Sequence, residues 1–471
     1  MASFSIENFG CRTTEADAAA MRAALLKSGF ALAAGHASAD FVVLNSCTVT
    51  AAADSQTREA VRKIHAANPA ARIVVTGCYA QRAPEEIAAI GGVAWVVGNS
   101  HQAEIPRVLR ETMGAELFAG EGNSRANPHT PRDFVPLARL GGGGASLARG
   151  PAKILVGDIF AETAVPVAPA APMAAGHTRP ILKIQDGCNN RCSYCVIPFV
   201  RGRSRSLPPD AVIGEVRRLV AGGAKEIVLS GINLGSYGRD LAPRAALADV
   251  VRRILAETEL EQLRFSSIEP QDITEDFAGL AAESGRIAPH FHVPLQSGSD
   301  SVLRAMHRWY RTGHYAERIA LIRRLLPHAA IGADIVAGFP GETEADFEAT
   351  LAFVARLPFT YLHVFSFSAR PGTEGGKLGC VVPAAAIRER ARALRALGEQ
   401  KSAGFRASQA GRTMRALTLS RGRDDWTEAL TANYLKVRIA GRHPANQWRE
   451  VQIAADAQAL SDCISACCES A

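Results

Sequence analysis

Short runs rich in valine and isoleucine alternate with helical patterns along most of the chain. Four such runs precede residue 100 and six more lie between residues 180 and 370. Parallel strands need long, usually helical, connections, so this alternation indicates a parallel α/β architecture. We predict an N-terminal doubly wound parallel sheet followed by a partial (β/α)6 barrel. After Gly411 shorter β-like segments predict a small C-terminal β-barrel.

These patterns divide the 471 residues into five segments. They are an N-terminal domain, a flexible linker, a central domain, a β-module and a tail: 1–113, 114–178, 179–408, 409–455 and 456–471. Glycine, alanine and proline dominate the linker, which is the composition of a flexible connection. The piece KILVGDI inside it can still add a strand to a neighbouring domain.

Composition narrows the class of protein. Hydrophobic residues make up 47% and charged residues 21%, which excludes wholesale disorder. Ten cysteines are too few for a disulfide scaffold of this length. The start of the chain lacks the pattern of a signal peptide, and no apolar run reaches about 18 residues. We expect a cytoplasmic protein without a membrane partner, whose cysteines are reduced thiols or metal ligands.

The strongest motif is the loop Asp186-Gly-Cys188-Asn-Asn-Arg-Cys192-Ser-Tyr-Cys195, which follows the strand-like run ILKIQ. Three thiolates at this spacing can bind three irons of a [4Fe–4S] cluster and leave the fourth iron for a substrate or cofactor. A zinc site would need a fourth cysteine or histidine, and none lies in this loop. A zinc knuckle and chance clustering remain the alternatives.

Three more cysteines, Cys11, Cys47 and Cys78, each follow a strand-like run in the first domain. The carboxyl ends of parallel strands meet at one edge of a sheet, where ligands bind. The three thiols can therefore converge on a second cluster. The alternative is that they are buried cysteines that act as small hydrophobic residues.

The CxxxCxxC loop resembles that of the radical S-adenosylmethionine (SAM) superfamily. This resemblance implies that SAM chelates the free iron and is cleaved, after one-electron reduction, to a 5′-deoxyadenosyl radical. The residues around the other cysteines resemble those of the methylthiotransferases, a family within that superfamily that modifies tRNA or a ribosomal protein. The phrases CTVT, GCYAQ and GCNNRCSYCVIPFVRGRSRS are most similar to the subgroup that acts on threonylcarbamoyladenosine in tRNA. One departure is Thr13-Thr14 after Arg12, where the family usually has an asparagine.

The resemblance also implies a SAM pocket at the ends of the barrel strands. Polar or glycine-rich segments occur there, and ordinary loop chemistry is the alternative for any single residue. Arg201, Arg203 and Arg205 form the phrase RGRSRS and can hold the SAM carboxylate or an RNA phosphate. The alternative is that these arginines are only solvated. The cofactor-binding residues that we predict are Ser230, Gly231, Asn233, Ser266, Glu269, Gln296 and Arg201.

The phrase Asn433-Tyr-Leu-Lys-Val437 is similar to the usual ending of a TRAM domain, a small RNA-binding β-barrel, so the C-terminal module resembles that domain. Residues 386–423 contain ten lysines or arginines and two glutamates, although the whole chain has a net charge of only +7. A basic helix is often only a solvated face. Because a β-module with Trp426 and Tyr434 follows it, RNA held by charge and by stacking on these aromatic rings is the preferred interpretation.

Together these features predict a tRNA methylthiotransferase with two [4Fe–4S] clusters, SAM, a tRNA anticodon stem-loop and an electron donor such as flavodoxin or ferredoxin. The alternatives are the same chemistry on isopentenyladenosine in tRNA or on a ribosomal-protein side chain, and a non-catalytic zinc-containing RNA-binding protein. No role is assigned to four cysteines, of which the last three are expected in a frayed terminus: Cys380, Cys463, Cys467 and Cys468.

Overall fold

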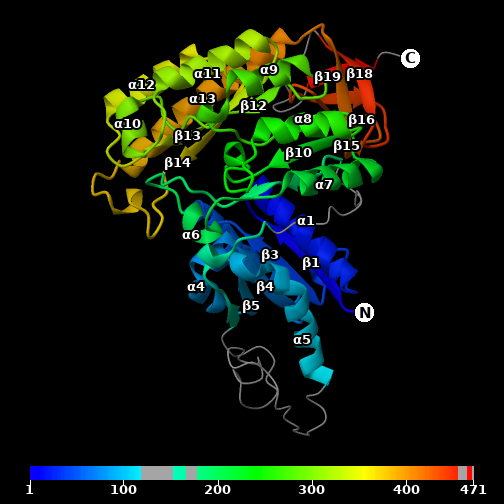
Figure 1. The fold of residues 1–471 in the computed structure, drawn as a ribbon. Helices are drawn as coiled ribbons and strands as arrows, with labels where there is room; N and C mark the ends of the chain where they lie inside the picture. Colours follow the sequence, from blue (N-terminus) through cyan, green and yellow to red (C-terminus); the bar gives the residue numbers. More distant parts are fainter. Residues whose placement is uncertain (118–151, 166–177, 455–463, 469–471) are drawn as a thin grey trace.

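A computed structural model describes residues 1–117, 152–165, 178–454 and 464–468. Figure 1 shows an N-terminal α/β domain at the bottom, a larger α/β part above it and a small β-barrel beside that part. Most of the predicted linker lies outside the described residues. Within the described ranges no helix combines the length and apolarity needed to span a bilayer.

The N-terminal domain is a six-stranded parallel sheet in the order β2-β1-β3-β4-β5-β6. All six residues of β3 are buried, as expected for a strand covered on both faces. The strands are β1 Ser3–Asn8, β2 Ala31–Leu32, β3 Phe41–Ser46, β4 Arg72–Gly77, β5 Val93–Gly98 and β6 Lys153–Leu155. The last of them comes from the predicted linker, where it extends the sheet along β5.

Helices cover both faces of this sheet, which confirms the predicted doubly wound architecture. Leu44 and Val75 pack with residues of α2 and α4 on one face. Phe41 and Val43 pack with residues of α1 and α5 on the other face. The helices are α1 Arg12–Lys27, α2 Ala51–Ala67, α3 Cys78–Arg82, α4 Pro84–Ala88 and α5 Ile105–Leu117.

The central part is an open barrel of six parallel strands in chain order. Two three-stranded sheets, β7-β10-β11 and β12-β13-β14, are joined by a parallel bridge between Ser267 and His292. This arrangement confirms the predicted partial (β/α)6 barrel. The strands are β7 Ile181–Lys183, β10 Glu226–Ser230, β11 Gln262–Phe265, β12 His290–His292, β13 Ala330–Ala337 and β14 Tyr361–Ser366.

One continuous hydrophobic cluster fills the space between these strands and the surrounding helices. The short strands β8 Gln185–Asp186 and β9 Arg205–Ser206 pair beside the cysteine loop. The helices are α6 Ile197–Arg201, α7 Pro209–Ala221, α8 Leu247–Glu257, α9 Glu275–Glu283, α10 Asp300–Ala305, α11 Thr312–Leu325, α12 Glu344–Arg356 and α13 Ala384–Ser408.

The C-terminal module is a closed five-stranded barrel in the order β15-β16-β17-β19-β18, which confirms the predicted small β-barrel. Its strands are β15 Thr413–Arg423, β16 Trp426–Thr431, β17 Lys436–Ala440, β18 Trp448–Ile453 and β19 Ile464–Cys468. The sequence predicted a frayed tail from residue 456, but β19 closes the barrel between β17 and β18. A closed barrel has no unpaired strand edge, so the backbone hydrogen bonds to β17 and β18 stabilise β19 in the barrel.

Candidate functional site between the N-terminal domain and the barrel

Cys11, Cys47 and Cys78 follow three neighbouring strands of the N-terminal sheet, β1, β3 and β4. Cys11 caps the start of α1, and Cys78 is the first residue of α3. A side chain on Gly10 would come within 2.9 Å of Cys47 Cβ, so the chain before Cys11 passes directly over Cys47. The structure therefore brings this trio together at one edge of the sheet.

Burial controls the protonation of these thiols. Cys47 and Cys78 are buried, and Cys11 is exposed. Burial, reinforced by the negative charge of Cys78, raises the pKa of Cys47 to about 12. Burial also raises the pKa of Cys78, and Arg201 opposes that rise. Thiols in such a setting become thiolates readily only when a bound metal supplies compensating positive charge.

The second trio lies on the loop between β8 and α6. The backbone N–H of Cys195 donates to the carbonyl of Cys192 at 3.0 Å, which makes a tight turn. The guanidinium of Arg308 donates to Cys192 Sγ at 3.2 Å. Burial, followed by the charge of Cys192, raises the pKa of Cys195 to about 12. Burial also raises the pKa of Cys188.

The spread of the sulfur atoms tests which metal group these trios fit. In neither trio do all three Sγ atoms lie within 4.8 Å of one another, as far as the described residues extend. A single zinc ion, with Zn–S bonds of about 2.3 Å, would bring its ligands closer together than that. Thiolates that bind separate irons of one cluster have no such requirement. The donor type and the spread of both trios therefore fit [4Fe–4S] clusters better than zinc.

A buried charge network connects the two trios. Arg201 donates to Asp17 of α1 at 2.7 Å and to Asp186 at 3.2 Å. Lys183 contacts both carboxylates, at 2.8 Å for Asp186. Burial raises the pKa of Asp186, but the charges of Lys183 and Arg201 outweigh it and hold that pKa below its ordinary value.

The environment of Arg201 differs from the expected one. Its guanidinium is directed to Asp17, Asp186 and Cys78, and its side chain is only 2% exposed. It therefore lies against the N-terminal trio, with two carboxylates already bound to it. The reason is tertiary: α1 supplies Asp17, which the sequence of the loop does not reveal.

The other residues predicted to contact SAM lie where the barrel strands end. Three of them carry buried polar atoms that have no hydrogen-bond partner within the described structure: Ser230 Oγ, Asn233 Oδ1 and Ser266 Oγ. Asn233 Nδ2 lies 4.0 Å from Cys188 Sγ, so this polar edge adjoins the cysteine loop. Buried polar groups are nearly always satisfied, so three orphaned atoms at one edge fit a bound polar ligand such as SAM.

Among the remaining predicted contacts, the carboxylate of Glu269 has a protein partner, and Gly231 and Gln296 are notable for their backbone. Glu269 forms an ion pair with Arg308, which also donates to Cys192. A side chain on Gly231 would come within 2.8 Å of Gln185 Oε1, so glycine keeps this turn close to β8. Gln296 has a φ of 70°, a conformation that is uncommon for a residue with a side chain. Its backbone bridges to β13 through Ile335.

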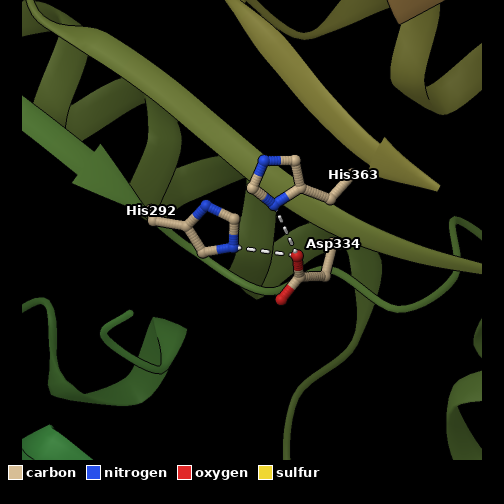
Figure 2. Close-up of side chains that lie close together, drawn as sticks. All are labelled: His292, Asp334 and His363. Atoms are coloured by element: carbon tan, nitrogen blue, oxygen red, sulfur yellow. Dashed lines mark ion pairs between the residues drawn. The ribbon is translucent and has the colours of Figure 1, made fainter. Parts of the chain in front are cut away.

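The sequence interpretation did not identify Arg308 or a polar cluster inside the barrel. Figure 2 shows this cluster: His292 of β12, Asp334 of β13 and His363 of β14. Nε2 of His292 lies 3.0 Å from Asp334 Oδ1, and Nδ1 of His363 lies 3.3 Å from the same oxygen. One signal was available, since the alternation in HFH directs both histidines of β12 to one face.

Tyr434 does not lie where an RNA base can stack on it. It sits in a turn of the small barrel with a φ of 71° and points into the floor of the (β/α)6 barrel. Its ring stacks on His290 at 4.1 Å and receives the guanidinium of Arg264 at 5.3 Å. Its hydroxyl accepts a 3.0 Å hydrogen bond from Arg12. Tyr434 therefore docks the small barrel on the rest of the chain, which corrects its expected role.

Comparisons with known proteins agree with this arrangement. The model of "Uncharacterized protein family UPF0004" matches residues 3–98, and that of the radical SAM superfamily matches residues 182–354. The structure of the radical S-adenosylmethionine methyltransferase TsrM from Kitasatospora setae has a similar fold. The TM-score is 0.52 at 17% identity, over 80% of this chain and 75% of that one.

Curated relatives cover nearly the whole chain. The threonylcarbamoyladenosine tRNA methylthiotransferase MtaB of Aquifex aeolicus is 33% identical over 93% of this chain and 96% of its own length. The Bacillus subtilis protein of the same name is 32% identical, over 94% and 91%. The tRNA-2-methylthio-N(6)-dimethylallyladenosine synthase of Moorella thermoacetica is 32% identical, over 83% and 81%. This chain therefore belongs to the radical-SAM methylthiotransferase family.

Proposed function

We propose that this protein is a tRNA methylthiotransferase that converts N6-threonylcarbamoyladenosine at position 37 into its 2-methylthio derivative. The observation that carries the proposal is the contact between the two cysteine trios. Val196, which follows Cys195 directly, packs with Val200 against Cys78 in one buried cluster. A radical generated at one trio and a sulfur group held at the other would thus serve one nucleoside. Relatives of nearly full length carry this substrate in their names.

Each trio would hold one [4Fe–4S] cluster. Cys188, Cys192 and Cys195 would bind three irons and leave the fourth for SAM. When bound, this cluster would supply the one-electron chemistry that activates an unreactive C–H bond. Side chains of the protein would stabilise the cluster ligands and bind SAM. The Arg308 guanidinium donates to Cys192 Sγ, which stabilises that sulfur as an anion. The hydroxyls of Ser230 and Ser266 are available to SAM.

The RNA-binding surface would combine α13 with the small barrel. Arg388, Arg392, Arg421 and Arg423 are exposed there and can neutralise phosphates of an anticodon stem-loop. Trp426 is half-buried under Arg438, whose guanidinium lies 4.5 Å from its ring centre. A reductant such as flavodoxin or ferredoxin would deliver the electron, and tRNA modification would place the protein in the cytoplasm.

Nucleoside mass spectrometry of tRNA tests this function. We expect tRNA from a deletion strain to lack 2-methylthio-threonylcarbamoyladenosine and to regain it with the wild-type gene. A Cys380→Ala gene is the matched control, because Cys380 is exposed and belongs to neither trio. If the deletion leaves this nucleoside unchanged and removes 2-methylthio-isopentenyladenosine instead, the substrate assignment is wrong. Loss of neither nucleoside contradicts the tRNA function.

A further inference from the structure

The strand β14 presents alternate side chains to the two sides of the barrel wall. Leu362 and Val364 pack outward into the hydrophobic cluster beneath α13. Tyr361 and His363 therefore face inward, since successive side chains of a strand alternate. A side chain on Gly332 of β13 would overlap the Tyr361 ring, which places that ring on the inner face too. The polar cluster of Figure 2 thus lines the barrel interior.

Hydrogen bonding fixes the direction of the imidazole rings. Asp334 only accepts hydrogen bonds, so His292 Nε2 and His363 Nδ1 both carry hydrogens toward it. The other nitrogen of His292 contacts the Tyr361 hydroxyl at 3.1 Å. That hydroxyl also contacts His290 Nε2 at 2.8 Å. His292 is thereby held from two sides, by Asp334 and by Tyr361.

His363 is the open end of this series of hydrogen bonds. Its side chain is 54% exposed, whereas those of Asp334 and His292 are 23% and 7% exposed. Nδ1 is engaged by Asp334, and no described residue forms a hydrogen bond with Nε2. In the imidazolium form both ring nitrogens carry hydrogens, so Nε2 can donate to a bound anion while Nδ1 donates to Asp334. The geometry resembles a carboxylate-oriented histidine whose far nitrogen meets a substrate.

The floor of the barrel carries an excess of positive charge. Arg12, Arg179 and Arg264 surround Tyr434, and Glu226 is the carboxylate paired with two of them. Burial raises the pKa of Tyr434, but these three arginines outweigh it and lower that pKa. Arg12 follows Cys11 directly and donates to the Tyr434 hydroxyl, and the Tyr434 ring centre lies 5.9 Å from that of Tyr361. This charge therefore lies between the N-terminal trio and the polar cluster. With Asp334 counted beside Glu226, the three arginines still exceed the two carboxylates by one, which favours an anionic group in this interior.

We propose that His363, oriented by Asp334, is a specificity-determining residue that binds the carboxylate of the N6 substituent of the target adenosine. The inference rests on the proposed function. It explains a choice that overall similarity leaves open, because relatives named for threonylcarbamoyl- and dimethylallyl-adenosine match this chain at 33% and 32% identity. A threonylcarbamoyl group bears a carboxylate, and an isoprenoid group does not. A site that hydrogen-bonds a polar group discriminates strongly against an analogue that lacks it.

The test uses the full chain with reconstituted clusters and three anticodon stem-loops, which carry threonylcarbamoyl-, isopentenyl- or unmodified adenosine. We expect the wild type to bind the threonylcarbamoyl stem-loop about tenfold or more tightly than the unmodified one, the gain of a charge-assisted hydrogen bond. His363→Phe should lose this preference and bind the unmodified stem-loop as before. His363→Gln, which keeps an amide near Nε2, should retain part of it. The matched control is His36→Phe, at a half-exposed pair with Glu7 in the N-terminal domain.

Iron content and the thermal midpoint of unfolding are measured for every variant, so that a misfolded protein is recognised. If His363→Phe is misfolded, His363→Gln is compared with the wild type in its place. Retention of the full preference by His363→Phe overturns the proposal. A wild type that shows no preference but makes the methylthio product overturns it and leaves the proposed function intact. A wild type that makes no product contradicts the proposed function as well. A stoichiometric divalent ion that is lost in His363→Phe also overturns the proposal, since the cluster would then be a metal site.

Discussion

The guanidinium of Arg201 donates a 2.7 Å hydrogen bond to Asp17, and this bond crosses from the barrel to the first helix of the N-terminal domain. Both side chains are 2% exposed. Lys183 binds the same carboxylate, so Asp17 balances two buried cations. The bond joins the helix that follows Cys11 to α6, the helix that follows Cys195, and so it connects the two cysteine trios.

Replacing Asp17 therefore tests the domain interface. Asp17→Asn leaves buried positive charge uncompensated and should lower the free energy of unfolding by about 3–5 kcal/mol. Urea unfolding followed by circular dichroism measures the change. The matched control is Glu7→Gln, which breaks a pair with His36 in which both side chains are 40% exposed. That pair should contribute at most about 1 kcal/mol. Equal losses in the two variants would show that the network does not stabilise the interface.

The two trios should have separable roles. Cys192→Ala should abolish SAM cleavage, and Cys47→Ala should retain some cleavage without forming thiolated product. Each variant should hold about four irons per chain in place of about eight, since each loses one cluster. Iron analysis and chromatography of 5′-deoxyadenosine measure both effects, with Cys380→Ala as control. Full product formation by Cys47→Ala would refute the two-cluster arrangement.

His290 makes folding stability dependent on pH. Burial, followed by the charges of Arg264 and Arg12, holds the pKa of His290 well below its ordinary value, so the folded ring stays neutral. Below the ordinary histidine pKa of about 6.5 the unfolded chain binds a proton that the folded chain does not. Stability should then fall by up to about 1.4 kcal/mol per pH unit from this residue.

The measurement compares the wild type with His290→Gln between about pH 7 and about pH 5. Glutamine does not titrate, so the free energy of unfolding of this variant should fall less steeply with decreasing pH. Wild-type and variant curves that run parallel over this range would show that His290 is not kept neutral by folding.

RNA affinity should depend on α13 and not on Tyr434. Arg388 and Arg392 are exposed on α13, and Tyr434 is packed on His290. The double variant Arg388→Ala, Arg392→Ala should weaken binding of a stem-loop. It should also reduce the salt dependence of the logarithmic affinity by about one for each phosphate that is no longer neutralised. Tyr434→Phe should leave both quantities unchanged. A loss of RNA affinity in Tyr434→Phe with α13 variants unaffected would reverse this assignment.

Much of the architecture was predictable because its signals are local. Each cysteine of the N-terminal trio follows its strand by three residues or fewer, so recognising the strands placed the thiols at one sheet edge. The CxxxCxxC loop places its thiols within one tight turn in the same way. Strand–helix alternation then determined the order of the barrel, since parallel strands connected by helices leave few possible topologies.

Tertiary structure decided the contacts between residues far apart in the chain. Arg201 meets Asp17, and Tyr434 enters the barrel floor. His363 of β14 and His292 of β12 meet at Asp334 of the strand between them, β13. Likewise β6 and β19 are short segments that form strands through their tertiary partners. β6 pairs with the sheet edge at β5, and β19 pairs with β17 and β18 in the small barrel. Sequence by itself determined which chemistry each segment carries and on which side of a strand it lies. The packing of separate domains decided which groups meet, because long-range burial and charge pairing have no signature in local sequence pattern.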